Sequence, residues 1–209
     1  MPKQTFFHLS PEKQNKLLQS AKEEFSRVPL HEASIANIIK KAGIPRGSFY
    51  QYFADKEDLF YYLLHQLSQK NFERFVTLLQ EKDGDLFATC LDFFRLMVKD
   101  HKSQEHKNFF RNAFSNMNYR LEKTLASNVY EENQKSQNRL MMNMINRKHL
   151  NVKDDQELHH LIKIITAITF HNLVQTFAKD LTEEEALQNY RQQMEMVKRG
   201  LYLENGASV

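Results

Sequence analysis

The hydrophobic and polar residues of this 209-residue chain repeat with the period of an α-helix along most of its length. Apolar residues recur three or four positions apart, and only 5 Gly and 4 Pro interrupt the pattern. It predicts an all-α fold with helices at about 11–28, 35–42, 45–53, 56–82, 85–100, 104–116, 119–147, 155–179 and 183–203.

The most informative stretch is the pair of short helices at 35–42 and 45–53. Ser34 can cap the first helix, because its hydroxyl can accept a hydrogen bond from an otherwise unpaired backbone N–H. Gly43 suits the left-handed residue that often ends a helix, and Pro45 suits the first position of the next one. The stretch therefore predicts a helix-turn-helix.

The second of these short helices has a polar outer face. Phe49 and Phe53 lie four residues apart and are predicted to face inward. The side chains left outside are those of Arg46, Gly47, Ser48, Gln51 and Tyr52. Because Arg and Gln can bind base edges and hydroxyls can bind phosphates, this face suits a helix that enters a DNA major groove.

The same stretch fits the pattern A-G-[IV]-x-x-[GS]-[ST]-[FL]-Y-x-[YH]-F-x-x-K-E-x-L. The matching residues are Ala42-Gly43-Ile44, Gly47-Ser48-Phe49-Tyr50, Tyr52-Phe53 and Lys56-Glu57-x-Leu59. On these residues the chain resembles the DNA-binding domain of the TetR family of bacterial transcriptional regulators. The resemblance implies a three-helix helix-turn-helix DNA-binding domain at 1–56, joined by a long helix to a helical effector-binding and dimerisation domain at 57–209.

The resemblance also implies which residues contact DNA. Arg46 is predicted to bind a base edge, with Gln51 as a second base reader, and Lys56 to bind a phosphate at the start of the linking helix. The alternative for the two tyrosines is that they only pack against the phenylalanines of the same helix. The full predicted set is Ser34, Asn37, Pro45, Arg46, Gly47, Ser48, Tyr50, Gln51, Tyr52 and Lys56.

The net charge of +3 is too small to indicate DNA binding by itself, but the distribution of charge along the chain supports this assignment. Residues 1–56 contain 9 Lys/Arg and 5 Asp/Glu, a balance of +4. Residues 57–209 contain 20 Lys/Arg and 21 Asp/Glu, a balance of −1. The positive excess therefore lies in the segment that carries the DNA-reading pattern.

The two helices predicted at 155–179 and 183–203 carry broad apolar surfaces. These surfaces either close the protein's own core or contact a second subunit. In TetR-like proteins the corresponding pair forms a four-helix bundle in a homodimer, which would let two helix-turn-helix motifs bind two half-sites. The predicted interface residues are Leu161, Ile165, Ile168, Leu187, Tyr190, Met194, Val197 and Leu201.

The region 86–149 is rich in Phe and Met. TetR-like regulators usually hold an effector pocket in their middle helices, and such a lining suits a sizeable apolar small molecule. The alternative is that these side chains only fill the core. The predicted ligand-binding residues are Phe94, Met97, Phe110, Phe114, Met117, Met141, Ile145, His149, Phe170 and His171.

Nine histidines raise the alternative of haem or metal binding. No resident cofactor or metal is predicted, because neither the group His101, Glu105 and His106 nor the adjacent pair His159 and His160 has good ligand spacing. Some TetR-like regulators sense haem, so haem is kept as an alternative effector. Its candidate axial ligands are His149, His171 and Tyr130.

Several classes of protein are disfavoured. The chain has no G-x-S-x-G, no Walker-type loop and no G-x-G-x-x-G, so no enzyme is predicted. Cys90 is the only cysteine, which excludes an internal disulfide and fits a reducing cytoplasm. The apolar run 158–177 is interrupted by polar residues and is not predicted to span a membrane.

Together these features predict a cytoplasmic, ligand-responsive transcriptional regulator, most simply a repressor. It would bind a palindromic operator in double-stranded DNA as a homodimer and would be released by an effector. The alternatives are a DNA-binding adaptor controlled by a protein partner, and a haem- or metal-binding protein whose helix-turn-helix is incidental.

Overall fold

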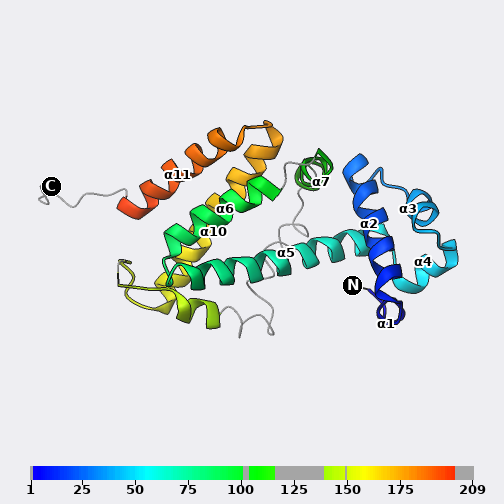
Figure 1. Cartoon of the computed structure of the whole chain (residues 1–209), viewed down its shortest axis with the longest axis horizontal. Coiled ribbons are helices and arrows are strands. Elements are labelled where there is room, and N and C mark those ends of the chain that lie inside the picture. The colour runs from blue at the N-terminus through cyan, green and yellow to red at the C-terminus, as the bar shows by residue number, and fades with distance from the viewer. Residues whose placement is uncertain (1, 101–103, 116–138, 149, 201–209) are drawn as a thin grey trace, which may run out of the picture. The chain divides into compact units, whose positions relative to one another are not determined.

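A computed structural model of the chain describes residues 2–100, 104–115, 139–148 and 150–200. Across these ranges the regular secondary structure is entirely helical, which confirms the predicted all-α fold (Figure 1). The helices are α1 (Gln4–Phe7), α2 (Pro11–Arg27), α3 (Ile35–Ala42), α4 (Arg46–Tyr52), α5 (Lys56–Glu81), α6 (Leu86–Asp100), α7 (Gln104–Ser115), α10 (Asp155–Ala178) and α11 (Glu183–Arg199).

Of the predicted start and stop signals, Gly43 acts as expected, whereas the Ser34 hydroxyl makes no cap bond and Pro45 occupies the N-cap position of α4 and not its first residue. The Ser10 hydroxyl accepts a hydrogen bond from the backbone N–H of Lys13 at the start of α2. Thr182 and Glu185 form a reciprocal capping box at the start of α11. Gly43 ends α3 in the left-handed region, with φ of 71°. Caps and breakers therefore fix the helix ends to within a residue or two.

Two parts of the chain differ from the expected element order. The four-residue helix α1 was not predicted. Most of the helix predicted at 119–147 lies outside the described residues, although 139–144 are helical. The helix predicted to run to 203 ends at Arg199 in the described part, and Leu201 lies outside it.

The chain divides into two compact units. The first contains Met1–Phe72 and His101–Ser136, and the second contains Glu73–Asp100 and Gln137–Val209. The domain boundary predicted at residue 56 coincides with the start of α5, whereas this division falls within α5, between Phe72 and Glu73. Helix α7 belongs to the first unit, where it packs on α2.

The core of the first unit is built largely from aromatic rings. Phe6, Phe49 and Phe53 are fully buried, and the rings of Phe6 and Phe53 lie 5.1 Å apart. Across α2, the Asn112 amide on α7 donates hydrogen bonds to the backbone carbonyls of Phe25 and Ser26, both at 3.1 Å. The end of α2 is thus tied to α7 by two backbone acceptors.

The core of the second unit lies where α6, α10 and α11 pack together. Tyr190 is fully buried and stacks on Phe94 with ring centroids 4.1 Å apart. The Tyr190 hydroxyl lies 2.7 Å from the Thr169 hydroxyl, so the buried phenol has a hydrogen-bond partner. Burial raises the pKa of the neighbouring Cys90 thiol to about 12, which keeps it protonated and unreactive at neutral pH.

Helix α10 is long and apolar enough to cross a membrane by length and composition alone. Its most apolar 18-residue window has a mean hydropathy of 1.3, and 28% of that window is buried in the structure. Leu158, Ile165 and Leu173 point into the core of the second unit. A helix that packs one face in a core and exposes another apolar face passes the same test as a membrane span.

Candidate nucleic-acid interface

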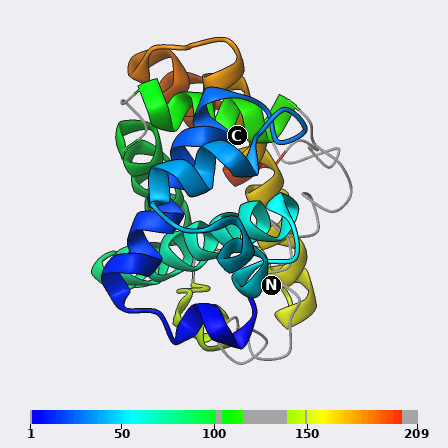
Figure 2. The same cartoon turned by 90° about the vertical axis from the view of Figure 1, so that its right-hand side faces the viewer.

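Helices α3 and α4 form the predicted helix-turn-helix. The turn is closed by the backbone N–H groups of Gly43 and Ile44, which both donate to the carbonyl of Ile39, at 2.9 and 3.1 Å. Ile38 and Ala42 on α3 and Phe49 on α4 are buried. Because these apolar residues face inward, the opposite faces of both helices remain available. In Figure 2, α3 and α4 are on the side that faces the viewer.

The outer face of α4 carries the polar groups that the sequence predicts. Arg46, Gly47 and Gln51 are exposed, whereas Ser48 and Tyr52 are half-buried. The Tyr50 side chain is 38% exposed, and the Arg46 guanidinium carbon lies 6.0 Å from the centre of its ring. This distance is within cation–π range, so the ring steadies the guanidinium while its N–H donors stay accessible.

Gly47 lies on the outer face of α4 at a position where packing does not require glycine. A Cβ atom added at Gly47 would meet no described residue within 4 Å, and Gly47 has ordinary helical backbone geometry. An alanine would favour the helix by roughly 0.5–1 kcal/mol, so neither packing nor backbone conformation requires glycine here. A second molecule that approaches the backbone closely would require it.

The predicted phosphate ligands Ser34 and Asn37 already have a partner within the chain. Both donate to the same oxygen of Glu24, Ser34 through its backbone N–H at 2.9 Å and Asn37 through its amide at 3.1 Å. Glu24 is 6% exposed and also binds the Arg27 guanidinium through two hydrogen bonds of 2.8 and 2.9 Å. The Arg27 hydrogen bond is the main cause that lowers the pKa of Glu24, which therefore remains a carboxylate.

Two details of this network differ from the sequence interpretation. The Ser34 hydroxyl does not cap α3, although Ser34 occupies the cap position. Sequence reasoning missed Glu24, because a glutamate in the middle of an amphipathic helix is usually solvated. Its position among the buried residues Ala21 and Phe25 is the only signal that could have drawn attention to it.

Lys56 also has an internal role. Its ammonium group donates to the carbonyls of His31 and Ala33, at 2.8 and 3.0 Å. An ammonium has three donors, so one remains for a phosphate. The predicted DNA contact of Lys56 therefore stays a prediction, and the structure adds a bond to the connection that precedes α3.

The predicted effector-binding residues that the structure describes are divided between the two units. Phe94, Met141 and Ile145 are buried in the second unit, and Phe110 is buried in the first. Met97 and Phe170 are half-buried, whereas His171 is exposed. Met117, His149 and the side chain of Phe114 lie outside the described residues. The predicted apolar pocket stays a prediction.

The haem and metal candidates are only partly described. Tyr130, His101 and the side chains of Glu105 and His106 lie outside the described residues, as does His149. Among the residues that are described, no three His, Cys, Asp or Glu side chains gather closely enough to hold a metal ion.

The prediction for the dimer interface needs correction at three positions. Ile165, Tyr190 and Met194 are 3%, 0% and 1% exposed within a single chain, so they cannot contact a second subunit. Tyr190 faces α6 instead, where it stacks on Phe94. The remaining predicted residues that are described are half-buried: Leu161, Ile168, Leu187 and Val197.

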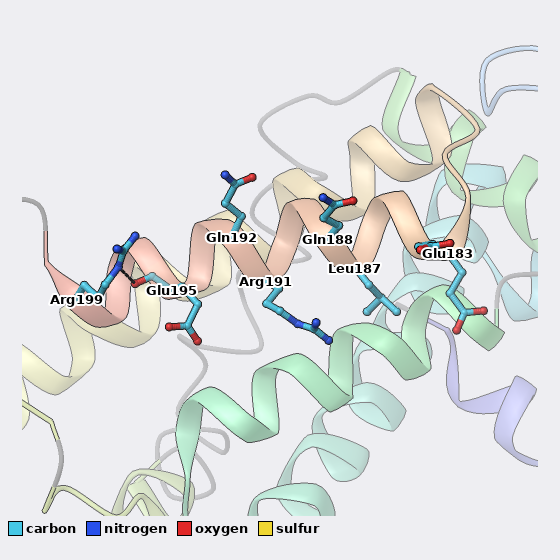
Figure 3. A pocket seen from close by; sticks show the side chains of 8 residues that line it. Glu183, Leu187, Gln188, Arg191, Gln192, Glu195 and Arg199 are labelled. Carbon is cyan, nitrogen blue, oxygen red and sulfur yellow. Dashed lines mark hydrogen bonds between the residues drawn. The ribbon is translucent and has the colours of Figure 1, made fainter.

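An open pocket runs along α11 (Figure 3). Most of its lining side chains are charged or carry amides, so it differs from the predicted apolar effector pocket. The lining residues are Glu183, Glu184, Leu187, Gln188, Arg191, Gln192, Glu195 and Arg199.

Comparison with known proteins agrees with this geometry. Residues 17–63 match the family model described as bacterial regulatory proteins, tetR family, and residues 85–201 match the model described as tetracyclin repressor-like, C-terminal domain. The chain is 29% identical over 167 residues to the uncharacterized HTH-type transcriptional regulator YvdT of Bacillus subtilis (strain 168). That alignment covers 69% of this chain and 82% of YvdT.

Solved structures share the fold. The transcriptional regulator FadR from Bacillus subtilis in complex with stearoyl-CoA has a TM-score of 0.63 at 15% identity, covering 90% of this chain and 99% of FadR. The fatty acid degradation regulator FadR from Bacillus halodurans has a TM-score of 0.62 at 15% identity over the same shares. Because one family model spans more than half of the residues, the chain belongs to the TetR family of helix-turn-helix transcriptional regulators, which are not enzymes.

Proposed function

We propose that this protein is a ligand-responsive repressor that binds a palindromic operator as a homodimer. The observation that carries the proposal is the outer face of α4, where Arg46 and Gln51 are exposed beside a glycine that the fold does not need. Such a face can enter a major groove, with the arginine positioned to bind a guanine edge and the glycine allowing close approach. We place the protein in the cytoplasm, where its operator would be.

Dimerisation through α10 is supported by a stripe of exposed and half-exposed residues along that helix. Ile164 at the centre of the stripe is 53% exposed. Successive members are spaced 4, 3, 4, 3 and 4 residues apart, which is the spacing of a helix-packing seam. The seam consists of His160, Ile164, Ala167, His171, Val174 and Ala178. A second copy of the chain that packs on this seam would cover it and bring two α4 helices onto one duplex.

The effector class rests on the Phe and Met content of the middle helices, which suits a large apolar molecule. Stearoyl-CoA is bound in the FadR structure from Bacillus subtilis and is therefore the first probe to use. An effector held by the second unit would act on the first through α5, since this helix contributes to both. A coupling of a few kcal/mol would suffice to release an operator.

The operator is tested by selecting duplexes from a random-sequence pool with the purified protein. Recovery of a palindromic sequence that shifts in a mobility assay is the expected result, and stearoyl-CoA should reverse the shift. If no sequence is enriched, the proposal of a sequence-specific repressor is wrong. If a sequence is enriched but stearoyl-CoA leaves the complex intact, only that effector class is removed.

The seam is tested with Ile164→Lys, which places a charge at its centre. The matched control is Leu140→Lys, because Leu140 is also a highly exposed apolar residue, at 64%, but lies outside the seam. We expect the first variant to sediment as a monomer and the second to behave like the unmodified protein. If Ile164→Lys still sediments as a dimer, this seam is not the dimer interface.

A further inference from the structure

We infer that the N-terminal arm, residues 3–7, forms the C-terminal cap of the DNA-reading helix α4, and that Lys3 and Thr5 are positioning residues for DNA recognition. The inference rests on the proposed function of α4. Neither the helix-turn-helix pattern nor the family model, which begins at residue 17, includes these residues.

The arm binds three successive backbone carbonyls at the end of α4. The Lys3 ammonium donates to the carbonyl of Tyr50 at 2.8 Å, and the Lys3 backbone N–H donates to the carbonyl of Tyr52, also at 2.8 Å. The Thr5 hydroxyl donates to the carbonyl of Gln51 between them. The preceding carbonyl, of Phe49, accepts from the N–H of Phe53 at 2.9 Å.

Helix α4 needs such a cap because it has only 7 residues. The last four carbonyls of any helix have no partner within the helix, so in α4 they make up most of its acceptors. A helix this short is unstable on its own and depends on contacts at its ends. The positive charge of Lys3 also lies at the negative end of the helix dipole, where a cation is favourable.

The arm is held in place by burial as well as by hydrogen bonds. Phe6 is fully buried, and its ring centre lies 5.1 Å from that of Phe53 and 5.6 Å from that of Tyr62. Phe6 therefore fixes the arm against the end of α4 and the start of α5. This anchoring keeps Lys3 and Thr5 beside the last turn of α4.

The three carbonyls belong to residues whose side chains are predicted to contact DNA. Because Tyr50, Gln51 and Tyr52 form the last turn of α4, any loosening of that turn moves their side chains relative to the groove. Contacts to bases need accurate placement, whereas contacts to phosphates through long side chains tolerate small shifts. Loss of the cap should therefore reduce sequence-specific binding more than non-specific binding.

The experiment compares variants of the full chain on two duplexes: the sequence selected by the unmodified protein, and a shuffled sequence of the same length and composition. Lys3→Met removes the ammonium but keeps the stem, and Thr5→Val removes the hydroxyl without a change of charge. Lys3→Arg and Thr5→Ser are the conservative variants that keep a donor. Lys13→Met is the charge-matched control, since it removes an exposed cation from the first turn of α2.

We expect Lys3→Met and Thr5→Val each to weaken binding of the selected duplex about three- to tenfold, with little change on the shuffled one. The slope of log affinity against log salt should stay constant, and the conservative variants should restore binding. Amide hydrogen exchange of the free protein should become faster in α4 but not in α3. A merely structural role would lower thermal stability without changing the ratio between the two duplexes.

Three results would overturn the inference. Equal loss on both duplexes with a salt slope smaller by about one would make Lys3 a phosphate ligand instead. An equal loss of binding for Lys3→Met and Lys13→Met would show that Lys3 contributes only through its positive charge. Unchanged DNA binding by Thr5→Val, together with unchanged amide exchange in α4, would show that the arm does not cap α4. Failure of the unmodified protein to select any duplex contradicts the proposed function, while the exchange measurement still tests the cap.

Discussion

Both units of this protein have buried aromatic cores, but the two short helices of the first unit also depend on polar contacts at their ends. In the first unit, α3 and α4 have 8 and 7 residues, and polar groups from other segments hold the ends of these helices. In the second unit, longer helices pack through buried rings, with Phe94 on Tyr190 at the centre. Under the proposed function, α4 presents one face to DNA and can therefore bury only the other face.

The largest effect is expected at the centre of the second unit. Tyr190→Ala should lower the free energy of unfolding by about 3–5 kcal/mol, since it removes a fully buried ring and leaves a cavity beside Phe94. Tyr190→Phe is the matched control, which keeps the ring and loses the hydroxyl contacts to Thr169 and to the Cys90 thiol, at about 1 kcal/mol. Urea unfolding at one fixed protein concentration measures both. Similar losses for the two variants would mean that the hydroxyl, not the ring, dominates.

Glu24 tests the polar network of the first unit. Glu24→Gln should cost about 1.5–3 kcal/mol of stability at pH 7, because the charged hydrogen bonds to Arg27 and Ser34 are lost. The pKa of Glu24 is lowered from its usual 4.5, so its carboxylate contributes fully above pH 4.5 and this contribution is lost as the pH falls through the lowered pKa. The difference from the unmodified protein should therefore shrink in acid.

The measurement for Glu24 is urea unfolding at pH 7 and at pH 3, with Glu12→Gln as the control. Glu12 is an exposed carboxylate on the same helix. A difference that stays constant between the two pH values would show that the charge of Glu24 is not what stabilises the network.

Arg46 tests whether the outer face of α4 binds bases. Arg46→Ala should cost about 1–3 kcal/mol of binding to the selected duplex, and less on a shuffled duplex. Lys40→Ala, which removes an exposed cation from α3, is the control for general charge. Mobility assays with both duplexes give the comparison. Equal losses of Arg46→Ala on the two duplexes would exclude Arg46 as a base reader.

The smallest effects are expected at two glycines of the helix-turn-helix. Gly43→Ala should destabilise the protein by about 1 kcal/mol, because residue 43 has φ of 71°. Gly47→Ala should stabilise the protein by about 0.5–1 kcal/mol, because the added methyl group meets no described residue within 4 Å. It should also weaken DNA binding, because under the proposed function the α4 backbone approaches the groove closely at this position. Thermal unfolding and a mobility assay test the pair. Unimpaired DNA binding by Gly47→Ala would show that the backbone does not approach DNA closely at this position.

The local features of the fold could be predicted from the sequence because they depend on single residues. Ser10, Gly43 and Thr182 each act through their own backbone geometry or side chain, so the sequence alone indicates the helix ends at these positions. The helix-turn-helix could be predicted for the same reason. Features that depend on residues far apart in the sequence could not be predicted.

The N-terminal arm and the surface of α10 that we propose as the dimer seam show why the rest could not be predicted. Lys3 and Tyr50 are 47 positions apart, and four residues of α1 are too few to display a helical period. On α11, periodicity identified the stripe of Leu187, Tyr190 and Met194 but not what covers it. The structure shows that α6 covers Tyr190, whereas the exposed seam lies on α10. The spacing of apolar residues predicts which face of a helix is buried, but it does not predict which helix or subunit covers that face.

The bonds of Lys56 have a mechanical consequence. Lys56 is the first residue of α5, and its ammonium holds the carbonyls of His31 and Ala33, just ahead of α3. A small rotation of α5 about its own axis would therefore also displace the loop that precedes α3. Lys56 thus links the start of the long helix directly to the segment that precedes the helix-turn-helix.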